Sequence, residues 1–348
     1  MSPRKRLRNL VHNLKDKASV IVASLSIKRH VSSIRVHVLR ATTHNFSTPP
    51  SEARIAAILS AGRGSYILPR ACINALMDRL HKTQNATVAL KCLFTLHNII
   101  AKGPLTLKDN LSYYPSHGGH NALNLSSFRD NADLEALELS TWVRWYAKVL
   151  EHVLTVSRVL GYYLSSSDGT EREHLGVSSG ELLGEIHGLV DFAERVSHVP
   201  DTLHLQRNDL VYEVVRLVGE DYGRVQREIL LRVEEIGKRM GRFDVGELRE
   251  LVSCLKRLEE SKGRLVLLFV NRKRNDAFWE VIGGVKSKGV VMMDEIEGKW
   301  MTVVTAKNES TRFTNPFLDP GQLVPVLPGG AWPGVTRNEF LLTVPTVG

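Results

Sequence analysis

The chain has 348 residues, of which 43% are hydrophobic and 24% charged, as in a soluble globular protein with a sizeable core. Its longest apolar run, Leu265 to Val270, is far below the roughly 18 residues of a membrane-spanning helix, and no secretory signal follows the basic N-terminus. Three widely separated cysteines (Cys72, Cys92 and Cys254) fit no zinc or redox spacing and are typical of the reduced, buried thiols of a cytosolic protein. Because no apolar run is long enough to span a membrane, a membrane role is expected to be peripheral and on the cytosolic side.

The net charge of +9 is concentrated at one end of the chain. Residues 1–54 contain eleven lysines or arginines against Asp16 and Glu52, whereas the remaining residues carry 35 basic and 35 acidic side chains. A directed excess of this kind predicts an anionic partner, either a membrane surface or a nucleic acid. A disordered basic tail is the alternative. The eleven basic residues are Arg4, Lys5, Arg6, Arg8, Lys15, Lys17, Lys28, Arg29, Arg35, Arg40 and Arg54.

Residues 7–25 are predicted to form an amphipathic helix with a basic border. Lys15 and Lys17 project about 80° to either side of the apolar stripe, and Asp16 lies opposite it. Lysines beside an apolar face suit a helix that lies in a lipid interface, where the ammonium groups reach phosphates. An ordinary first helix packed on a protein core fits the same pattern. The stripe consists of Leu7, Leu10, Val11, Leu14, Ala18, Ile21, Val22 and Leu25.

Helical periodicity continues to about residue 164, with few strand signals. A loop is predicted between His44 and Ser51, because Pro49 and Pro50 exclude a helix there. Ser51 is then expected to cap a short helix. A long connection is expected before the last helix of this half. The predicted helices cover residues 31–42, 51–59, 69–82, 84–102 and 139–164.

From residue 180 onward the sequence predicts long, charge-studded helices. Apolar stripes begin at Leu182, Leu210, Val225 and Val245, and each is expected to mark a separate helix. Short connections without a strand pattern predict stacked antiparallel helices, either a bundle or a solenoid-like superhelix. The periodicity fades beyond about residue 276, and residues 300–348 are expected to be mostly disordered.

The motifs predict no catalytic site. The segment from Gly176 to Gly180 has the G-x-S-x-G form of a hydrolase nucleophile elbow, but that turn needs a preceding strand. Ser178 is better explained as the cap of a helix that begins near Glu181. His117 and His120 lack a third metal ligand, so no metal or other cofactor is expected. No nucleic-acid-binding motif accompanies the basic segment, which leaves an anionic membrane surface as its partner.

Four sequence blocks follow one another between residues 39 and 146. They run from Leu39 to His44, from Lys82 to His97, from Leu123 to Asp130 and from Ser140 to Tyr146. In this order and spacing they resemble the ANTH-domain family of phosphatidylinositol-binding clathrin assembly proteins, particularly its short plant members. The resemblance is clear over roughly residues 10–165. The predicted helices at 180–260 agree with the family's second half in their long, charge-studded pattern and not in a specific motif.

The resemblance implies an all-α superhelical stack of antiparallel helices with a largely disordered C-terminal tail, and a protein that is not an enzyme. It implies binding of phosphatidylinositol 4,5-bisphosphate, promotion of clathrin coat assembly and sorting of SNAREs, at coated pits and vesicles or the Golgi. The implied parts are a basic amphipathic helix at 1–30, a lipid-binding core at 31–165, an extended second half at 180–275 and a tail at 276–348.

The family's lipid site is a lysine ahead of the A-T-[TS]-H stretch, followed by a lysine-rich cluster after the proline loop. Here Arg40 takes the first position, and only Arg54 keeps a positive charge in the second, because Glu52 replaces a base. Arginine can still bind phosphate through its fork of donors. The predicted lipid-binding residues are Arg40, Arg54, Lys28, Arg29, Arg35, Lys15 and Lys17.

The tail contains the tripeptide Asn315-Pro316-Phe317. It is similar to segments bound by EH-domain endocytic proteins, in which an Asx-Pro turn presents the aromatic ring. The rival interpretation of the whole chain is a protein–protein scaffold of the same fold, whose helices at 180–260 bind SNAREs or coat proteins. Glu52 and the missing lysines favour the scaffold, whereas the basic segment at residues 1–54 favours lipid.

Overall fold

The computed structural model describes residues 3–25, 29–46, 48–63, 67–115, 122–165, 177–269 and 272–310. In these ranges the protein is all-α, as predicted, and contains no strand. Among the helices of these residues, none combines the length and the apolar content that crossing a bilayer requires. Residues 1–297 form one compact unit, and the description that follows concerns this unit.

The first half of the unit contains seven α-helices and one short 3-10 helix within the described residues. They are α1 (Pro3–Ser24), α2 (Arg29–Ala41), α3 (Glu52–Leu59), η1 (Ser60–Arg63), α4 (Ile67–Lys82), α5 (Ala86–Lys102), α6 (Leu105–Ser112) and α7 (Leu134–Leu160). The second half contains longer helices. They are α8 (Ser179–Ser197), η4 (Leu203–Arg207), α9 (Asp209–Arg239), η5 (Met240–Arg242), α10 (Val245–Leu268) and α11 (Arg272–Ser310).

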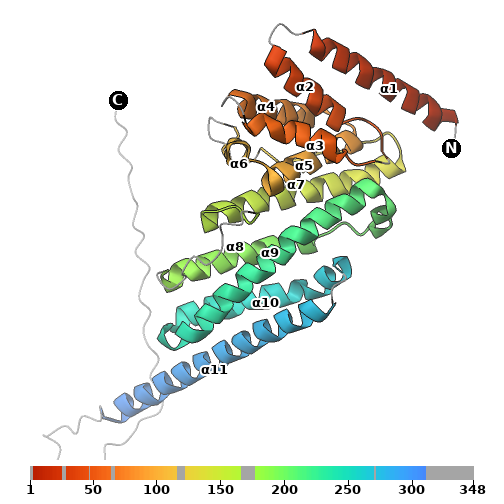
Figure 1. The fold of residues 1–348 in the computed structure, drawn as a ribbon. Helices are drawn as coiled ribbons and strands as arrows, with labels where there is room; N and C mark the ends of the chain where they lie inside the picture. Colours follow the sequence, from red (N-terminus) through yellow and green to blue (C-terminus); the bar gives the residue numbers. More distant parts are fainter. Residues whose placement is uncertain are drawn as a thin grey trace, which may run out of the picture. The chain divides into compact units, whose positions relative to one another are not determined.

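Successive helices pack on one another in layers (Figure 1). α2 contacts α1 on one side and α4 on the other, and α5 lies between α4 and α7. α8 contacts α7, α9 and α10, so it connects the two halves of the stack. α5 is the most enclosed helix, with every residue from 86 to 100 buried, and its sequence is accordingly mostly apolar, with a few buried polar residues such as Lys91 and His97.

Side-chain caps fix several helix starts. Asn85 accepts from the backbone N–H of Val88, and Asp133 accepts from that of Ala136 at the start of α7. Ser178 and Glu181 form a reciprocal capping box, which confirms the predicted role of Ser178 as a helix cap. Ser51 occupies the predicted cap position of α3 but makes no side-chain capping bond.

Three elements differ from the sequence-based expectation. α6 lies within the segment predicted as a long connection. α9 is one helix of 31 residues, where two stripes suggested two helices. Gly219 does not interrupt it, since a glycine costs only about 1 kcal/mol in a helix, and the missing side chain leaves room for the Phe269 ring. α11 extends through residues 300–310, which belong to the segment 300–348 that the sequence predicts to be mostly disordered. Residues 311–348 lie outside the described residues.

A buried polar cluster joins the two halves. His97 of α5 contacts the Tyr146 hydroxyl of α7 through Nδ1 at 2.8 Å. Its Nε2 contacts Asp221 of α9, also at 2.8 Å. Since a carboxylate can only accept, the Nε2–H of His97 donates to Asp221. The cluster therefore fixes the second half of the stack to the first at one position.

Candidate membrane interface

Helix α1 is attached to the protein by its polar face and turns its apolar stripe outward. Seven of the eight stripe residues are large and 54% to 77% exposed, whereas Ala23 on the opposite face is buried. The structure therefore contradicts the alternative in which the stripe packs on a core. The seven residues are Leu7, Leu10, Val11, Leu14, Ile21, Val22 and Leu25.

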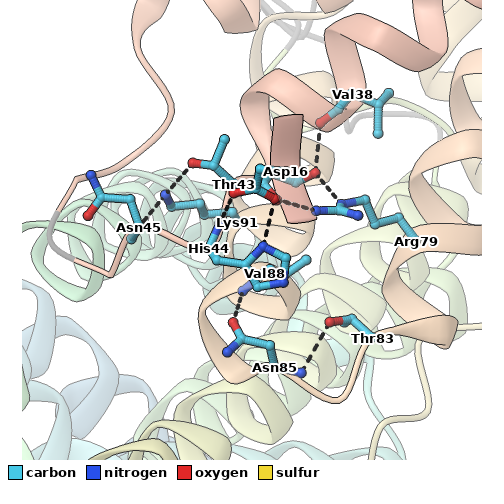
Figure 2. Close-up of polar contacts among 11 residues, drawn as sticks. Asp16, Val38, Thr43, His44, Asn45, Arg79, Thr83, Asn85, Val88 and Lys91 are labelled. Carbon is cyan, nitrogen blue, oxygen red and sulfur yellow. Dashed lines mark hydrogen bonds and ion pairs between the residues drawn. The ribbon is translucent and has the colours of Figure 1, made fainter. Parts of the chain in front are cut away.

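Asp16 is the centre of the attachment of α1. Its carboxylate accepts hydrogen bonds from His44 Nδ1 at 2.6 Å and from the His44 backbone N–H at 3.0 Å. Arg79 Nη2 lies 3.7 Å away (Figure 2). Burial alone would raise the pKa of Asp16, but the His44 hydrogen bonds and the charges of His44 and Arg79 outweigh it and lower the pKa below 3.8. At neutral pH Asp16 is a carboxylate held by the residues that follow α2.

Two further contacts hold α1. Arg8 Nη1 lies 2.8 Å from Asp133, the residue that caps α7. The Ser32 hydroxyl of α2 donates to the Ala23 carbonyl near the end of α1. All three attachments are polar, as the outward position of the apolar stripe requires.

Two basic side chains, Arg79 and Lys91, hold the segment after α2 through hydrogen bonds (Figure 2). Arg79 donates to the Thr42 hydroxyl at 2.7 Å and to the Thr42 carbonyl at 2.8 Å. Lys91 is 1% exposed and donates to the Asn45 carbonyl at 2.6 Å. Burial, followed by the charge of Arg54, lowers the pKa of Lys91 to about 8. Lys91 therefore shapes the loop between the two predicted lipid-binding arginines without reaching the surface.

The predicted lipid-binding residues fall into two groups on either side of α2. Arg35 and Lys15 line a cavity between α1, α2 and α4. Arg40 is exposed and does not line that cavity, because it lies about 140° from Arg35 around the helix. Arg54 is exposed on α3, which also packs on α2.

The other predicted residues occupy less defined places. Lys17 is exposed on α1. Arg29 begins α2, but its side chain is outside the description, and Lys28 lies outside the described residues. Asn315, Pro316, Phe317, His117 and His120 also lie outside the described residues.

Sequence reasoning missed His12, Arg79 and Lys82, which line the same cavity as Lys15 and Arg35. A helical spacing connects some of them. Arg79 and Lys82 are three residues apart on α4, and His12 and Lys15 are three apart on α1, so each pair shares a helix face. That these two faces border one cavity depends on the packing of both α1 and α4 against α2, which the spacing does not contain.

The described residues contain no cluster of three or more His, Cys, Asp or Glu side chains that could hold a metal ion. The three cysteines are free and buried. Burial raises the pKa of each thiol to about 12, so the thiolate needed for nucleophilic chemistry is not formed at neutral pH.

Comparisons with known proteins identify the family. The family model of the ANTH domain matches residues 33–198, from α2 to the end of α8. Three Arabidopsis thaliana proteins, each named "Putative clathrin assembly protein", are similar over most of their length. One is 40% identical over 295 residues, which are 81% of this chain and 80% of the relative. A second is 29% identical over 316 residues (85% and 91%), and a third is 29% identical over 299 residues (81% and 99%). The chain therefore belongs to the plant family of ANTH-domain clathrin assembly proteins.

Proposed function

We propose that this protein is a clathrin assembly adaptor that binds anionic, phosphoinositide-containing membranes through its first helices. The observation that carries the proposal is the orientation of α1, whose apolar stripe is exposed while its polar face holds the body of the protein. Lys15 and Lys17 border the stripe and are exposed. This is the arrangement of a helix that lies in the plane of a lipid interface.

The free energy of membrane binding is expected to come from both apolar and charged residues of this surface. Full burial of a leucine side chain contributes about 1.5–3 kcal/mol, and each lysine or arginine near an anionic surface contributes about 1 kcal/mol. Arg40 and Arg54 are exposed beside the loop that follows α2, where they can contact the phosphates of phosphatidylinositol 4,5-bisphosphate. Glu52 beside Arg54 weakens that preference and is the feature that favours a scaffold.

The role in coat assembly is supported by the names of the relatives, which are clathrin assembly proteins. Membership of the family also supports a location at coated pits and vesicles. On the same ground we propose that the protein takes part in sorting SNAREs. The tripeptide Asn315-Pro316-Phe317 is the part of the chain that we propose for binding EH-domain proteins.

Vesicle co-sedimentation of the full chain tests the membrane proposal. Vesicles with phosphatidylinositol 4,5-bisphosphate are compared with phosphatidylserine vesicles of equal surface charge. The double variant Leu10→Ser/Leu14→Ser is expected to lose most of its binding to both kinds of vesicle, because it removes two apolar side chains that would be buried in the lipid. The two leucines are at least 60% exposed and do not pack in the core of the protein. The double variant Arg40→Ala/Arg54→Ala is expected to lose the preference for the bisphosphate.

The matched control is Leu231→Ser/Leu267→Ser, which removes two exposed leucines from α9 and α10. It should bind vesicles like the unchanged protein. Equal binding by the α1 variant and the control would reject insertion of the stripe. No binding by the unchanged protein at physiological salt would favour the scaffold function instead.

A further inference from the structure

A cavity of about 500 Å³ lies between α1, α2 and α4. All three helices contribute cationic side chains to its wall, and the arginines that match the family's lipid motif, Arg40 and Arg54, do not belong to it. Ser19 of α1 lines the same cavity. A side chain that can be phosphorylated therefore shares a wall with a cluster of positive charges. The cations are Lys15 from α1, Arg35 from α2, and Arg79 and Lys82 from α4.

Two of these cations lack a counter-charge among the residues that the structure describes. Lys15 and Arg35 are exposed, and neither forms an ion pair with a described carboxylate. Arg79 donates to Thr42 through Nε and Nη2, and no described residue accepts from its Nη1. Like charges held around one concave space repel one another, so an anion placed among them is stabilised.

Ser19 is suited to carry that anion. It follows Lys15 by four residues on α1, a spacing at which side chains are neighbours with about 5–6 Å between their Cβ atoms. It is partly exposed, and its hydroxyl makes no hydrogen bond to a described residue. A phosphate attached there would break no existing contact of that hydroxyl, and the cavity is far larger than a phosphoryl group.

The carboxylates near the cavity oppose a phosphate only in part. Asp16 lies one helical turn from Ser19, but it accepts hydrogen bonds from His44 and lies 3.7 Å from Arg79 Nη2. Its charge is therefore already compensated within the protein. The other carboxylates of the wall, which are engaged by Lys82 and by backbone N–H groups respectively, are Asp78 and Asp130.

We propose that Ser19 is a phosphorylation site and that its phosphate occupies this cavity, where Lys15, Arg35 and Arg79 donate charge-assisted hydrogen bonds to it. A protein kinase would transfer the γ-phosphoryl group of ATP to the Ser19 Oγ. The bond between the phosphorus and ADP breaks, the Oγ–P bond forms, and the hydroxyl proton passes to the base of the kinase. Phosphoserine carries a charge of about −1.5 to −2 at pH 7 and three acceptor oxygens, which match the cations of the wall.

A kinase can reach Ser19 when α1 leaves the surface. The three described attachments of α1 are polar and its apolar stripe is exposed, so this helix opens more readily than the core. Lys15 and Lys17 precede Ser19 by four and two residues, a charge pattern that suits a kinase with an acidic substrate groove. When α1 returns, the phosphate connects it to α2 and α4, so the modification holds the helix in its attached position.

A phosphate on α1 would also weaken the attraction to an anionic membrane, a consequence that rests on the proposed membrane function. It adds negative charge to a helix that is expected to lie against anionic lipid. It also engages Lys15, which borders the apolar stripe. Phosphorylation of Ser19 is therefore expected to keep the protein off the membrane, with α1 fastened to the body.

Phosphoserine placed at position 19 of the full chain during synthesis tests the phosphate site without the kinase. ³¹P NMR measures the second pKa of the phosphate, which is about 6 for an exposed phosphoserine. Nearby cations favour the dianion, so this pKa is expected below about 6 and should rise by about 0.5 or more in Lys15→Ala/Arg35→Ala. Hydrogen exchange of α1 amides should slow by about threefold or more when the phosphate is present.

Phosphoserine at position 24 is the matched control, because Ser24 is exposed on the same helix and does not line the cavity. Its pKa should not respond to Lys15→Ala/Arg35→Ala, and it should not slow the exchange of α1. An unchanged pKa at position 19 in the double variant, or an equal response at position 24, would overturn the phosphate site.

Mass spectrometry of the full chain expressed in plant cells tests whether Ser19 is modified. Trypsin cleavage after Lys17 and Lys28 places Ser19 in one peptide with Ser24 and Ser26, and fragment ions assign the phosphate among them. A phosphate at Ser19 that phosphatase treatment removes supports the modification, and its absence overturns it.

Vesicle co-sedimentation separates the phosphate site from the membrane function. With phosphatidylserine vesicles, the chain that carries phosphoserine at position 19 should bind about tenfold more weakly than the unmodified chain, because negative charge has been added. If the unmodified chain does not bind vesicles, the membrane function fails, whereas the pKa and exchange results still decide the phosphate site. Equal vesicle binding by the two forms, together with a lowered phosphate pKa, would reject the membrane consequence alone.

Discussion

His97 and His44 each pair with an aspartate from a distant part of the chain, but in different surroundings. The His97–Asp221 pair joins α5 to α9 at 2.8 Å, and its side chains are 0% and 4% exposed. The His44–Asp16 pair joins the segment after α2 to α1 at 2.6 Å, with side chains 8% and 14% exposed. The first pair also contacts Tyr146 in the core, whereas the second lies under a single helix whose outer face is free.

The comparison shows that one chemical pair can serve two purposes, depending on what must move to separate it. Separating His97 from Asp221 exposes the centre of the stack to water, so the pair is lost only when the core opens. Separating His44 from Asp16 requires only that α1 leave the surface, and the apolar stripe opposes this little because it is already exposed. We therefore expect α1 to detach at a free energy below that of global unfolding.

The largest effect is expected from Asp221→Ala. This substitution leaves His97 and Arg224 without their buried carboxylate, and breaking a buried pair from one side costs about 3–5 kcal/mol. Urea unfolding followed by circular dichroism measures the loss. Asp201→Ala is the control, because Asp201 is 96% exposed and should leave the midpoint unchanged. A similar midpoint for both variants would contradict a structural role for the buried pair.

Asp16→Ala should produce a smaller and more local effect. It removes the two hydrogen bonds from His44, and hydrogen bonds to a charged group contribute about 1.5–3 kcal/mol. Hydrogen exchange should accelerate in α1 while the urea midpoint of the whole protein moves much less. Asp78→Ala, which removes a more exposed carboxylate paired with Lys82, is the matched control. Unchanged exchange in α1 would mean that Asp16 does not hold this helix.

The attachment of α1 should also weaken in acid. Burial, followed by the charges of His44 and Arg8, lowers the pKa of His12 below 6.5. The attached state therefore binds fewer protons than the detached state, so the attachment is complete above about pH 6.5 and weakens as the pH falls toward the lowered pKa. Asp16, whose pKa is lowered below 3.8, adds a second loss at still lower pH.

Protection factors of α1 amides, corrected for intrinsic exchange, measure this dependence. We expect lower protection at about pH 5.5 than at about pH 7.5, by less than the effect of Asp16→Ala. His12→Gln should remove the difference between these two pH values. A difference that persists in His12→Gln would assign the titration to another group.

The sequence predicted the helix at α1, its apolar stripe and the position of Asp16 opposite the stripe, because these depend only on local periodicity. It left open whether the stripe faces a core or a membrane. That choice depends on His44, which is 28 residues from Asp16. His97 and Asp221 are 124 residues apart, and nothing in the local pattern of either indicates the other.

The candidate site was predictable to a similar depth. The basic segment and the residues Lys15 and Arg35 follow from charge counting, whereas their separation from Arg40 and Arg54 needs the helix packing. Arg79 and Lys82 lay outside the basic segment, and only the position of α4 beside α1 and α2 brings them to the cavity. Local pattern thus gave the parts of each surface, and long-range contacts decided which parts share one.

The smallest expected effect on stability is that of Leu14→Ser, and it completes the contrast between α1 and the core. Leu14 is 67% exposed, whereas Leu96 of α5 is 0% exposed, although both lie on apolar faces of helices. Leu96→Ala should lower the free energy of unfolding by about 2–5 kcal/mol. Leu14→Ser should change it by about 0.5 kcal/mol or less, because no packing is lost. A loss for Leu14→Ser as large as that for Leu96→Ala would mean that the stripe is covered in solution. A negligible loss for Leu14→Ser, measured in the same urea experiment, would mean that Leu14 is not required for folding and remains available to a membrane.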